Sequence, residues 1–323
     1  MRVALCLLAV LALLAGCGSG ADDLPRGQRP WQLALVAGSK GDPYYAALRC
    51  GAQDAAEAAG ADLSFKAPDQ LDASLQTPIL SAVVAEQPDA ILVAPADDRA
   101  LYAPIRQAAD SGSRVVLVDT WLARPGIAVS RVGSDDLAAG RQGATTLARL
   151  VGGHGKVLVV GPQAGVASAD ARRAGFEREV HARRGLRYLG ARAIEGDAGE
   201  VAKEVKEALE RTPDLAGIFA TTRTGAEGAA RTLRSEKRDG EVRLVGVDAS
   251  RQQLDDLEDD STQALVVLKP AEIGRLGVEQ ALAALEGRRP EPRIAVGFVV
   301  VTADNADDPR IARWLYAAQC NDG

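Results

Sequence analysis

Short apolar segments alternate with amphipathic segments along most of this chain. Apolar runs of strand length begin near Gln32, Asp62, Ala90 and Arg114, and again near Lys156, Arg187, Gly217 and Val242. Between them, apolar residues recur at helical spacing, as at Leu75, Ile79 and Val83. Uninterrupted apolar strands are typical of parallel sheets covered by helices on both faces. The pattern therefore predicts an α/β fold.

The alternation occurs twice, with similar spacing in each half. The fourth strand of each set ends on the same pair of residues, Val118-Asp119 and Val247-Asp248. The chain has 323 residues, more than one hydrophobic core usually supports. We therefore expect two Rossmann-like lobes with parallel-sheet cores. A helix over residues 270–286 and a strand over 298–301 must rejoin one lobe or the other, which would make a hinge of several connections.

The N-terminus is typical of an exported lipoprotein. Arg2 precedes an apolar run, residues 3–14, that is too short to span a bilayer and suits a signal peptide. Leu14-Ala15-Gly16-Cys17 resembles the lipobox of bacterial lipoproteins, in which the cysteine is acylated and the chain is cut before it. We expect a lipoprotein signal peptide at 1–16 and a flexible tether at 17–30. The alternative is an ordinary signal with a chance cysteine.

The remaining cysteines fit export. Apart from Cys6 in the expected signal and Cys17 at the expected lipid site, the chain has Cys50 and Cys320. An even pair in an oxidising compartment favours a disulfide. We expect this bridge to join the C-terminal tail, residues 307–323, to the first helix.

Composition and missing motifs exclude several classes of protein. The 44 acidic and 38 basic residues give a net charge of −6, which argues against a nucleic-acid partner. His154 and His181 are the two histidines, and neither has an evident orienting partner for catalysis. The sequence has no metal-spaced Cys/His cluster, P-loop, dinucleotide fingerprint or nucleophile elbow. We expect a protein without cofactor or metal that is not an enzyme.

Residues that follow the strands are the candidate ligand contacts, since ligands bind beyond the carboxyl ends of the strands in open α/β sheets. Carboxylates, an arginine and aromatic rings suit a polyhydroxylated ligand. The candidates are Asp42, Tyr44, Tyr45, Asp119, Thr120, Trp121, Arg172, Thr222, Arg223 and Asp248.

Some candidates also have ordinary structural explanations. Asp42 precedes a proline and would suit a helix cap. Tyr45 could belong to the core, and Arg172 could be half of a solvated pair with Arg173. The two carboxylates at matched strand ends are poor core residues, which favours a role in binding. If Arg172 contacts ligand, its truncation to alanine should weaken binding and leave the unliganded fold nearly intact.

Several short segments are specific in combination, namely Gly41-Asp42-Pro43-Tyr44-Tyr45, Val118-Asp119-Thr120, Val132-Gly133-Ser134-Asp135, Asp170-Ala171-Arg172-Arg173-Ala174-Gly175-Phe176 and Val245-Gly246-Val247-Asp248. With them, residues 31–320 resemble the sugar-type, ribose-binding-protein-like substrate-binding lipoproteins of bacterial ABC importers. The resemblance implies a periplasmic binding protein type I fold with three crossings, near Ser134, Leu268 and Gly297. It implies an N-terminal lobe of 31–134 plus 269–297 and a C-terminal lobe of 135–268 plus 298–306.

The resemblance also implies a function. The protein would be a monomeric receptor that closes on a sugar or sugar-like ligand and delivers it to the membrane permease of an ABC importer. It would be held in the cell envelope or on the outer face of the cytoplasmic membrane by its lipid anchor. The implied ligand contacts are Asp42, Tyr44, Tyr45, Asp119, Arg172 and Asp248.

The sequence departs from this family at four expected contacts. Relatives usually carry asparagine at Thr222, an acid or small polar residue at Arg223, glutamine at Leu268 and aspartate at Lys269. The added cations, Arg223 and Lys269, raise the hypothesis of a sugar acid as ligand, because an anion would pair with them. The alternative is that both face solvent or pair with the acidic run 255–260.

Two other functions stay open at this point. A receptor of the same fold could signal to a sensor kinase or chemoreceptor instead of feeding an importer. An extracytoplasmic carbohydrate-acting enzyme would need two carboxylates, one with a raised pKa.

Overall fold

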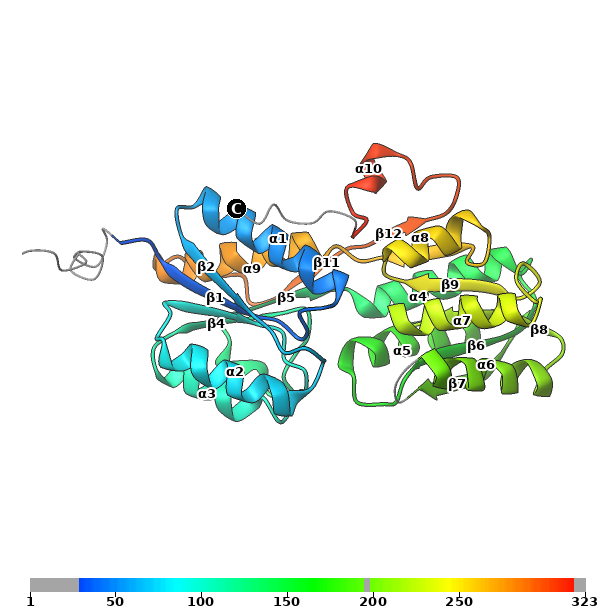
Figure 1. Ribbon diagram of the computed structural model, residues 1–323, viewed down its shortest axis with the longest axis horizontal. Coiled ribbons are helices and arrows are strands. Elements are labelled where there is room, and N and C mark those ends of the chain that lie inside the picture. Colours follow the sequence, from blue (N-terminus) through cyan, green and yellow to red (C-terminus); the bar gives the residue numbers. More distant parts are fainter. Residues whose placement is uncertain (1–28, 195–197, 317–323) are drawn as a thin grey trace, which may run out of the picture.

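The computed structural model describes residues 29–194 and 198–316, which form two lobes side by side (Figure 1). The N-terminal lobe has a sheet in the order β11(Ile294–Val296), β5(Ser130–Ser134), β4(Arg114–Val118), β3(Ala90–Val93), β1(Gln32–Val36) and β2(Asp62–Lys66). The C-terminal lobe has a sheet in the order β12(Val299–Val301), β10(Ala264–Val267), β9(Arg243–Val247), β8(Leu215–Ala220), β6(Gly155–Pro162) and β7(Leu186–Ile194). The described pairs are parallel except β10–β12, which is antiparallel.

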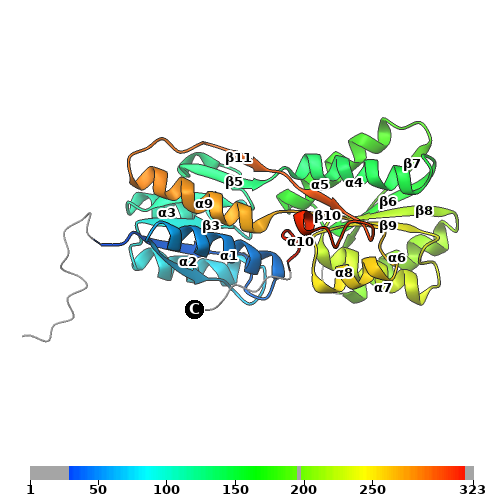
Figure 2. The same ribbon diagram turned by 90° about the horizontal axis from the view of Figure 1, so that it is seen from above.

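Helices cover both faces of each sheet, as the apolar strands predict. In the N-terminal lobe, α1(Pro43–Ala58) and α9(Pro270–Leu285) lie on one face, and α2(Ala73–Ala85) and α3(Tyr102–Asp110) lie on the other (Figures 1 and 2). In the C-terminal lobe, α4(Asp136–Leu150) and α5(Ala167–His181) lie on one face, and α6(Ala198–Arg211) and α7(Arg223–Ser235) lie on the other. Three short helices complete the fold: η1(Pro125–Ile127), α8(Arg251–Glu258) and α10(Pro309–Ala312).

The chain passes between the two lobes three times, as expected. It crosses from β5 to α4 after Ser134, from β10 to α9 after Leu268, and from β11 to β12 at Gly297. The last two crossings return α9 and β11 to the N-terminal lobe and β12 to the C-terminal lobe. The predicted two-lobed α/β fold with a three-crossing hinge is confirmed.

A close contact between two helices of the C-terminal lobe, α4 and α5, brings together residues of the site described below. Helices α4 and α5 approach so closely that a Cβ at Gly140 would overlap the carbonyl group of Arg172. Glycine at this position therefore lets the backbone of α5 touch α4. The contact places the start of α4 beside the first turns of α5.

Some sequence expectations differ from the structure. Strands β5, β10 and β11 were not among the predicted strands, and the described part of the expected C-terminal tail, residues 307–316, contains the four-residue helix α10. The expected signal, Cys17, most of the tether and Cys320 lie outside the described residues. Within the described ranges, no helix combines the length and the apolar character needed to cross a membrane.

Candidate functional site

Asp119 lies at the carboxyl end of β4 and is held by two consecutive tyrosines. The hydroxyl of Tyr44 donates to its Oδ1 at 2.8 Å, and the hydroxyl of Tyr45 donates to its Oδ2 at 2.9 Å. Both tyrosines lie in the first turn of α1, which Asp42 caps by accepting from the Tyr44 backbone N–H at 2.9 Å. The cap explanation for Asp42 is thus correct, and the cap places both rings against Asp119.

Burial makes Asp119 an unusual carboxylate. The residue is 7% exposed, and burial raises its pKa from 3.8 to about 6 despite the two tyrosine donors. Its backbone φ is 64°, in the left-handed region that aspartate tolerates better than most residues. Burial and the charge of Asp119 also raise the pKa of Tyr44 and of Tyr45 well above the ordinary value, so both stay protonated donors.

Asp248 occupies the matching position in the C-terminal lobe, at the end of β9. Its φ is 79°, again left-handed, and burial raises its pKa to about 6. The hydroxyl of Tyr316, from the C-terminal segment, donates to its Oδ1 at 2.9 Å. The repeated Val-Asp ending in the sequence therefore marks the same backbone geometry in both lobes and, at each strand end, a carboxyl group whose pKa is raised by burial. Asp119 is buried and Asp248 is half-buried.

Arg172 in α5 supplies the buried cation of this cluster. It is 6% exposed, its Nε donates to Asp136 at 2.8 Å, and its Nη1 donates to the Thr221 carbonyl at 2.9 Å. Burial alone would lower the pKa of Arg172, but the charges of Asp136, Asp248 and Asp119 raise it. Arg172 is therefore a buried group that interacts with carboxylates of both lobes, and the alternative of a solvated pair with Arg173 is wrong.

The added cations already have partners. Arg223 at the start of α7 lies 3.5 Å from Asp42 of the other lobe and 3.3 Å from Glu227. Lys269 lies 3.9 Å from Glu272, with its ammonium 4.3 Å from the centre of the Trp314 ring. None of these partners belongs to the acidic run 255–260. Because Arg223 and Lys269 are already paired within the protein, an anionic ligand is not needed to balance their charges.

Three other candidates make local contacts instead. The Thr120 hydroxyl donates to the Pro95 carbonyl at 2.8 Å, and the Thr222 hydroxyl caps α7 by accepting from the Gly225 N–H at 3.3 Å. Trp121 packs against the N-terminal sheet, with the Arg131 guanidinium 5.8 Å from its ring centre. None of these contacts involves Asp119, Arg172 or Asp248.

Sequence reasoning missed two members of the cluster. Asp136, 6% exposed in the first turn of α4, is the direct partner of Arg172. In the sequence, Asp136 is the second of two aspartates that follow the end of a strand. That pattern is also typical of ordinary helix capping, so it does not single out a site residue. In the sequence, three strands and three helices lie between Asp248 and Tyr316, and no local pattern predicts that contact.

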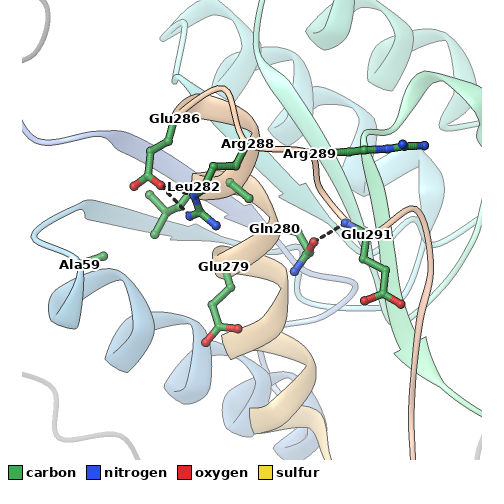
Figure 3. Close-up of a pocket in the computed structure, with 9 residues that line it drawn as sticks. Ala59, Glu279, Gln280, Leu282, Glu286, Arg288, Arg289 and Glu291 are labelled. Atoms are coloured by element: carbon green, nitrogen blue, oxygen red, sulfur yellow. Dashed lines mark hydrogen bonds and ion pairs between the residues drawn. The ribbon is translucent and has the colours of Figure 1, made fainter.

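A surface hollow of about 500 Å³ lies elsewhere, at the far ends of α1 and α9 (Figure 3). Both helices begin at the edge that carries Asp119, so their C-terminal ends lie at the opposite edge of the sheet. Its polar lining is satisfied internally: Arg288 pairs with Glu286 at 2.6 Å, and the Glu291 N–H donates to Gln280 at 2.7 Å. This hollow contains none of the predicted contacts.

Comparison with known proteins identifies the family. Residues 33–289 match the periplasmic binding protein domain. This chain belongs to the periplasmic binding protein family. The D-ribose/D-allose-binding protein of Pseudomonas aeruginosa is 29% identical over 311 residues, which cover 90% of this chain and 94% of that protein. The ribose import binding protein of Escherichia coli is 25% identical over 269 residues, which cover 83% and 90%.

Solved structures of binding proteins superpose over nearly the whole described chain. A solute-binding protein of an ABC transporter from Agrobacterium vitis, bound with α-D-tagatopyranose, is 33% identical with a TM-score of 0.86, covering 89% of this chain and 100% of that one. A carbohydrate-transporter binding protein from Agrobacterium radiobacter, in complex with D-arabinose, is 25% identical with a TM-score of 0.83, covering 89% and 99%.

Membership of the periplasmic binding protein family confirms several predictions. The resemblance to ribose-binding-protein-like receptors is correct, and the protein is a solute-binding protein that acts outside the cytoplasm and not an enzyme. In this periplasmic binding protein the buried polar cluster joins Asp119 of one lobe to Arg172 and Asp248 of the other. Among the described residues, no group of His, Cys, Asp and Glu could hold a metal ion.

Proposed function

We propose that this chain binds one monosaccharide between its lobes, through Asp119, Arg172 and Asp248, and delivers it to the permease of an ABC importer. The observation that carries this proposal is the pair of carboxylates at matched strand ends, Asp119 buried and Asp248 half-buried, whose charges both act on the buried Arg172. A carboxylate offers about four lone-pair sites, so each can accept from ligand hydroxyls beside its tyrosine partner. The relatives whose names state a sugar support the ligand class.

A neutral sugar fits the site better than a sugar acid. Arg223 is already balanced by Asp42 and Glu227, and the Lys269 ammonium by Glu272 and the face of Trp314. Burying the carboxylate of a sugar acid beside Asp119 and Asp248 would add a negative charge next to two carboxyl groups whose pKa is already raised by burial, and like charges in a poorly solvated site repel strongly.

Calorimetry and thermal unfolding of the chain lacking residues 1–17 test the proposal. The probes are D-tagatose, D-arabinose, D-ribose and D-allose, with D-galacturonate as the acidic counterpart of a hexose. We expect at least one neutral sugar to bind with a Kd of about 1 μM or below and to raise the unfolding midpoint, and galacturonate to bind at least about ten-fold more weakly. Tighter binding of galacturonate would support the sugar-acid hypothesis, and no binding by any probe would contradict the proposal.

We also propose that the receptor is a monomer held to the membrane through Cys17. The short apolar run and the lipobox-like motif support the anchor. The expected tether, residues 17–30, would then connect the acyl chains to the lobes. A tether of this length reaches about 20 Å, enough to lift the lobes off the bilayer.

A disulfide between Cys50 and Cys320 is the remaining part of the proposal. Cys50 of α1 lines a small hollow of about 50 Å³ together with Trp314 and Tyr316. The four residues from Tyr316 to Cys320 span at most about 14 Å, so Cys320 can reach this side of α1 only if the tail turns toward it. The contact of Tyr316 with the same hollow supports that direction.

Thiol titration checks the bridge. Without residues 1–17 the chain has two cysteines, and we expect no free thiol in the denatured, unreduced protein. The bridge would close the long loop between Cys50 and Cys320 and would stabilise the folded protein by on the order of 5 kcal/mol at most. Reduction of the bridge should therefore lower the unfolding midpoint by several degrees. A Cys50→Ser/Cys320→Ser variant is the control, since reductant should leave its midpoint unchanged. Two titrating thiols in the unreduced protein would contradict the bridge.

A further inference from the structure

The segment after β12, residues 302–316, is here called the C-terminal strap. In Figures 1 and 2 its helix α10 lies beside the junction of the two lobes, near α1 and α8. The Asn305 side chain accepts from the Thr302 N–H at 2.9 Å and donates to the Val300 carbonyl at 3.1 Å. Asp308 caps α10 by accepting from the Arg310 N–H at 2.9 Å. The strap is therefore a defined turn and helix that leads its last residues back toward the hinge.

The end of the strap is fixed at two points. The Trp314 ring lies 4.3 Å from the ammonium of Lys269, the residue that begins the second crossing. The Tyr316 backbone N–H donates to the Ala249 carbonyl, next to Asp248, at 3.3 Å. These contacts place the Tyr316 side chain between the hinge and the end of β9.

Tyr316 completes a row of aromatic rings between the carboxylates of Asp119 and Asp248. Its ring meets that of Tyr44 edge-on, with centroids 6.0 Å apart, and Tyr44 meets Tyr45 in the same way at 5.4 Å. The hydroxyls of Tyr44 and Tyr45 donate to Asp119, and the hydroxyl of Tyr316 donates to Asp248. The row thus joins the two lobes across the polar cluster.

Tyr316 belongs to the hydrophobic core cluster, which accounts for its ring but not for its hydroxyl group. Tyr316 lies outside both sheets, at the end of a segment that follows the last strand, and yet it is only 9% exposed. Behind it Leu268 is fully buried and presents an apolar side chain, so Tyr316 supplies the polar group at this point of the cluster. Its hydroxyl is 2.9 Å from Asp248 and 3.5 Å from the Leu268 carbonyl.

We propose that Tyr316 is a ligand-binding residue that the C-terminal strap adds to the site and that determines which sugar is accepted. The inference rests on the proposed sugar-binding function. A hydroxyl group has one donor and two acceptor sites, and Asp248 takes the donor. Tyr316 therefore accepts from the ligand, so it selects a sugar whose hydroxyl points its hydrogen toward the strap.

Calorimetry on Tyr316→Phe tests this inference, because phenylalanine keeps the ring and removes the hydroxyl. The probes are D-tagatose, D-arabinose, D-ribose and D-allose, and then the monodeoxy analogues of the one that the wild type binds best. We expect affinity to fall about 10- to 100-fold, as for loss of a hydrogen bond coupled to a charged group. Tyr188→Phe, on β7 of the same lobe and packed against Phe176 and His181, is the matched control and should change affinity less than about two-fold.

The analogues separate a ligand contact from a structural role. If Tyr316 contacts one ligand hydroxyl, removing that hydroxyl should cost the wild type affinity and cost Tyr316→Phe almost nothing, while the other positions behave alike in both proteins. The unfolding midpoint of unliganded Tyr316→Phe should stay within a few degrees of wild type.

The remaining outcomes overturn the inference in different ways. Unchanged affinity in Tyr316→Phe would make the ring a packing element only, and tighter binding would make the hydroxyl a competitor of the ligand for Asp248. If Tyr316→Phe loses the same affinity for every analogue, the hydroxyl affects binding without contacting any particular hydroxyl group of the ligand. If the wild type binds none of the sugars, the proposed function fails and this inference fails with it, whereas wild-type binding that Tyr316→Phe matches defeats this inference alone.

Discussion

Asp119→Asn is expected to abolish sugar binding and at the same time to stabilise the unliganded protein at neutral pH. The ionised carboxylate is 7% exposed, and in the proposed site it accepts from ligand hydroxyls. Hydrogen bonds to a charged group are about twice as strong as neutral ones, and an amide presents only one accepting oxygen. We therefore expect the affinity for the bound sugar to fall by at least about 100-fold.

The gain in stability depends on pH. Burial raises the pKa of Asp119 from 3.8 to about 6, so the folded chain holds this proton more tightly than the unfolded chain. The stabilisation that protonation provides is complete below the unfolded pKa and is lost as the pH rises through about 6. Asparagine has no charge to bury and avoids this loss, which amounts to at most about 3 kcal/mol. Ligand binding should show the opposite trend in the wild type and weaken below pH about 6, because it needs the ionised form.

Thermal unfolding at about pH 7.5 and pH 4.5, with calorimetry on the same samples, measures both effects. The unliganded variant should unfold at a higher temperature than wild type at the upper pH and show little advantage at the lower one. Asp54→Asn, which removes an exposed carboxylate from α1 in the same lobe, should change neither quantity appreciably. Wild-type affinity in Asp119→Asn, or an equal gain in midpoint at both pH values, would contradict the assignment.

Replacing Arg172 should cost both binding and stability. The sequence alone led us to expect a nearly intact unliganded fold after truncation of Arg172. The structure argues otherwise, because the Nε of Arg172 donates to the buried Asp136 at 2.8 Å within the same lobe. Removing one partner of a buried ion pair leaves the other charge without compensation, at a cost of about 3–5 kcal/mol. We expect Arg172→Met to lose that stability and at least about 100-fold in sugar affinity.

A double variant separates the two losses. Arg172→Met/Asp136→Asn removes both charges, and it should recover part of the stability and none of the affinity. Lys156→Ala breaks the exposed Lys156–Asp214 pair of the same lobe and should cost less than about 1 kcal/mol. Denaturant unfolding and calorimetry on the four proteins give the comparison. Recovery of sugar binding in the double variant would show that Arg172 supports the fold and does not touch the ligand.

Much of the fold could be predicted because parallel strands buried on both faces have a simple pattern. The strand starts at Gln32, Asp62, Ala90 and Arg114 agree with β1 to β4. Strand β5 was missed because Ser130, Arg131 and Ser134 interrupt its apolar character. Strand β11 has three residues, which is too short for any periodicity to show.

The site divides in the same way. Asp119, Asp248 and the paired tyrosines could be predicted because strand ends and first helical turns place them by local rules. Asp136 and Tyr316 could not, since their positions depend on packing between elements that are distant in sequence. Trp121 follows a strand end as the other candidates do, but its side chain packs against the sheet. A residue that directly follows a strand can be predicted to lie at the edge of the sheet, but the direction in which its side chain points cannot be predicted from that position.

The late return of α9 and β11 to the N-terminal lobe has a consequence for the order of folding. Ile273 and Val278 of α9 are fully buried on the face of β3, β4 and β5, so this lobe lacks part of its core until residues 270–296 have been made. Domains otherwise tend to fold from the N-terminus during synthesis. The N-terminal lobe therefore cannot complete its core until late in translation, and a chain that is still unfolded is the form that a secretion channel can thread.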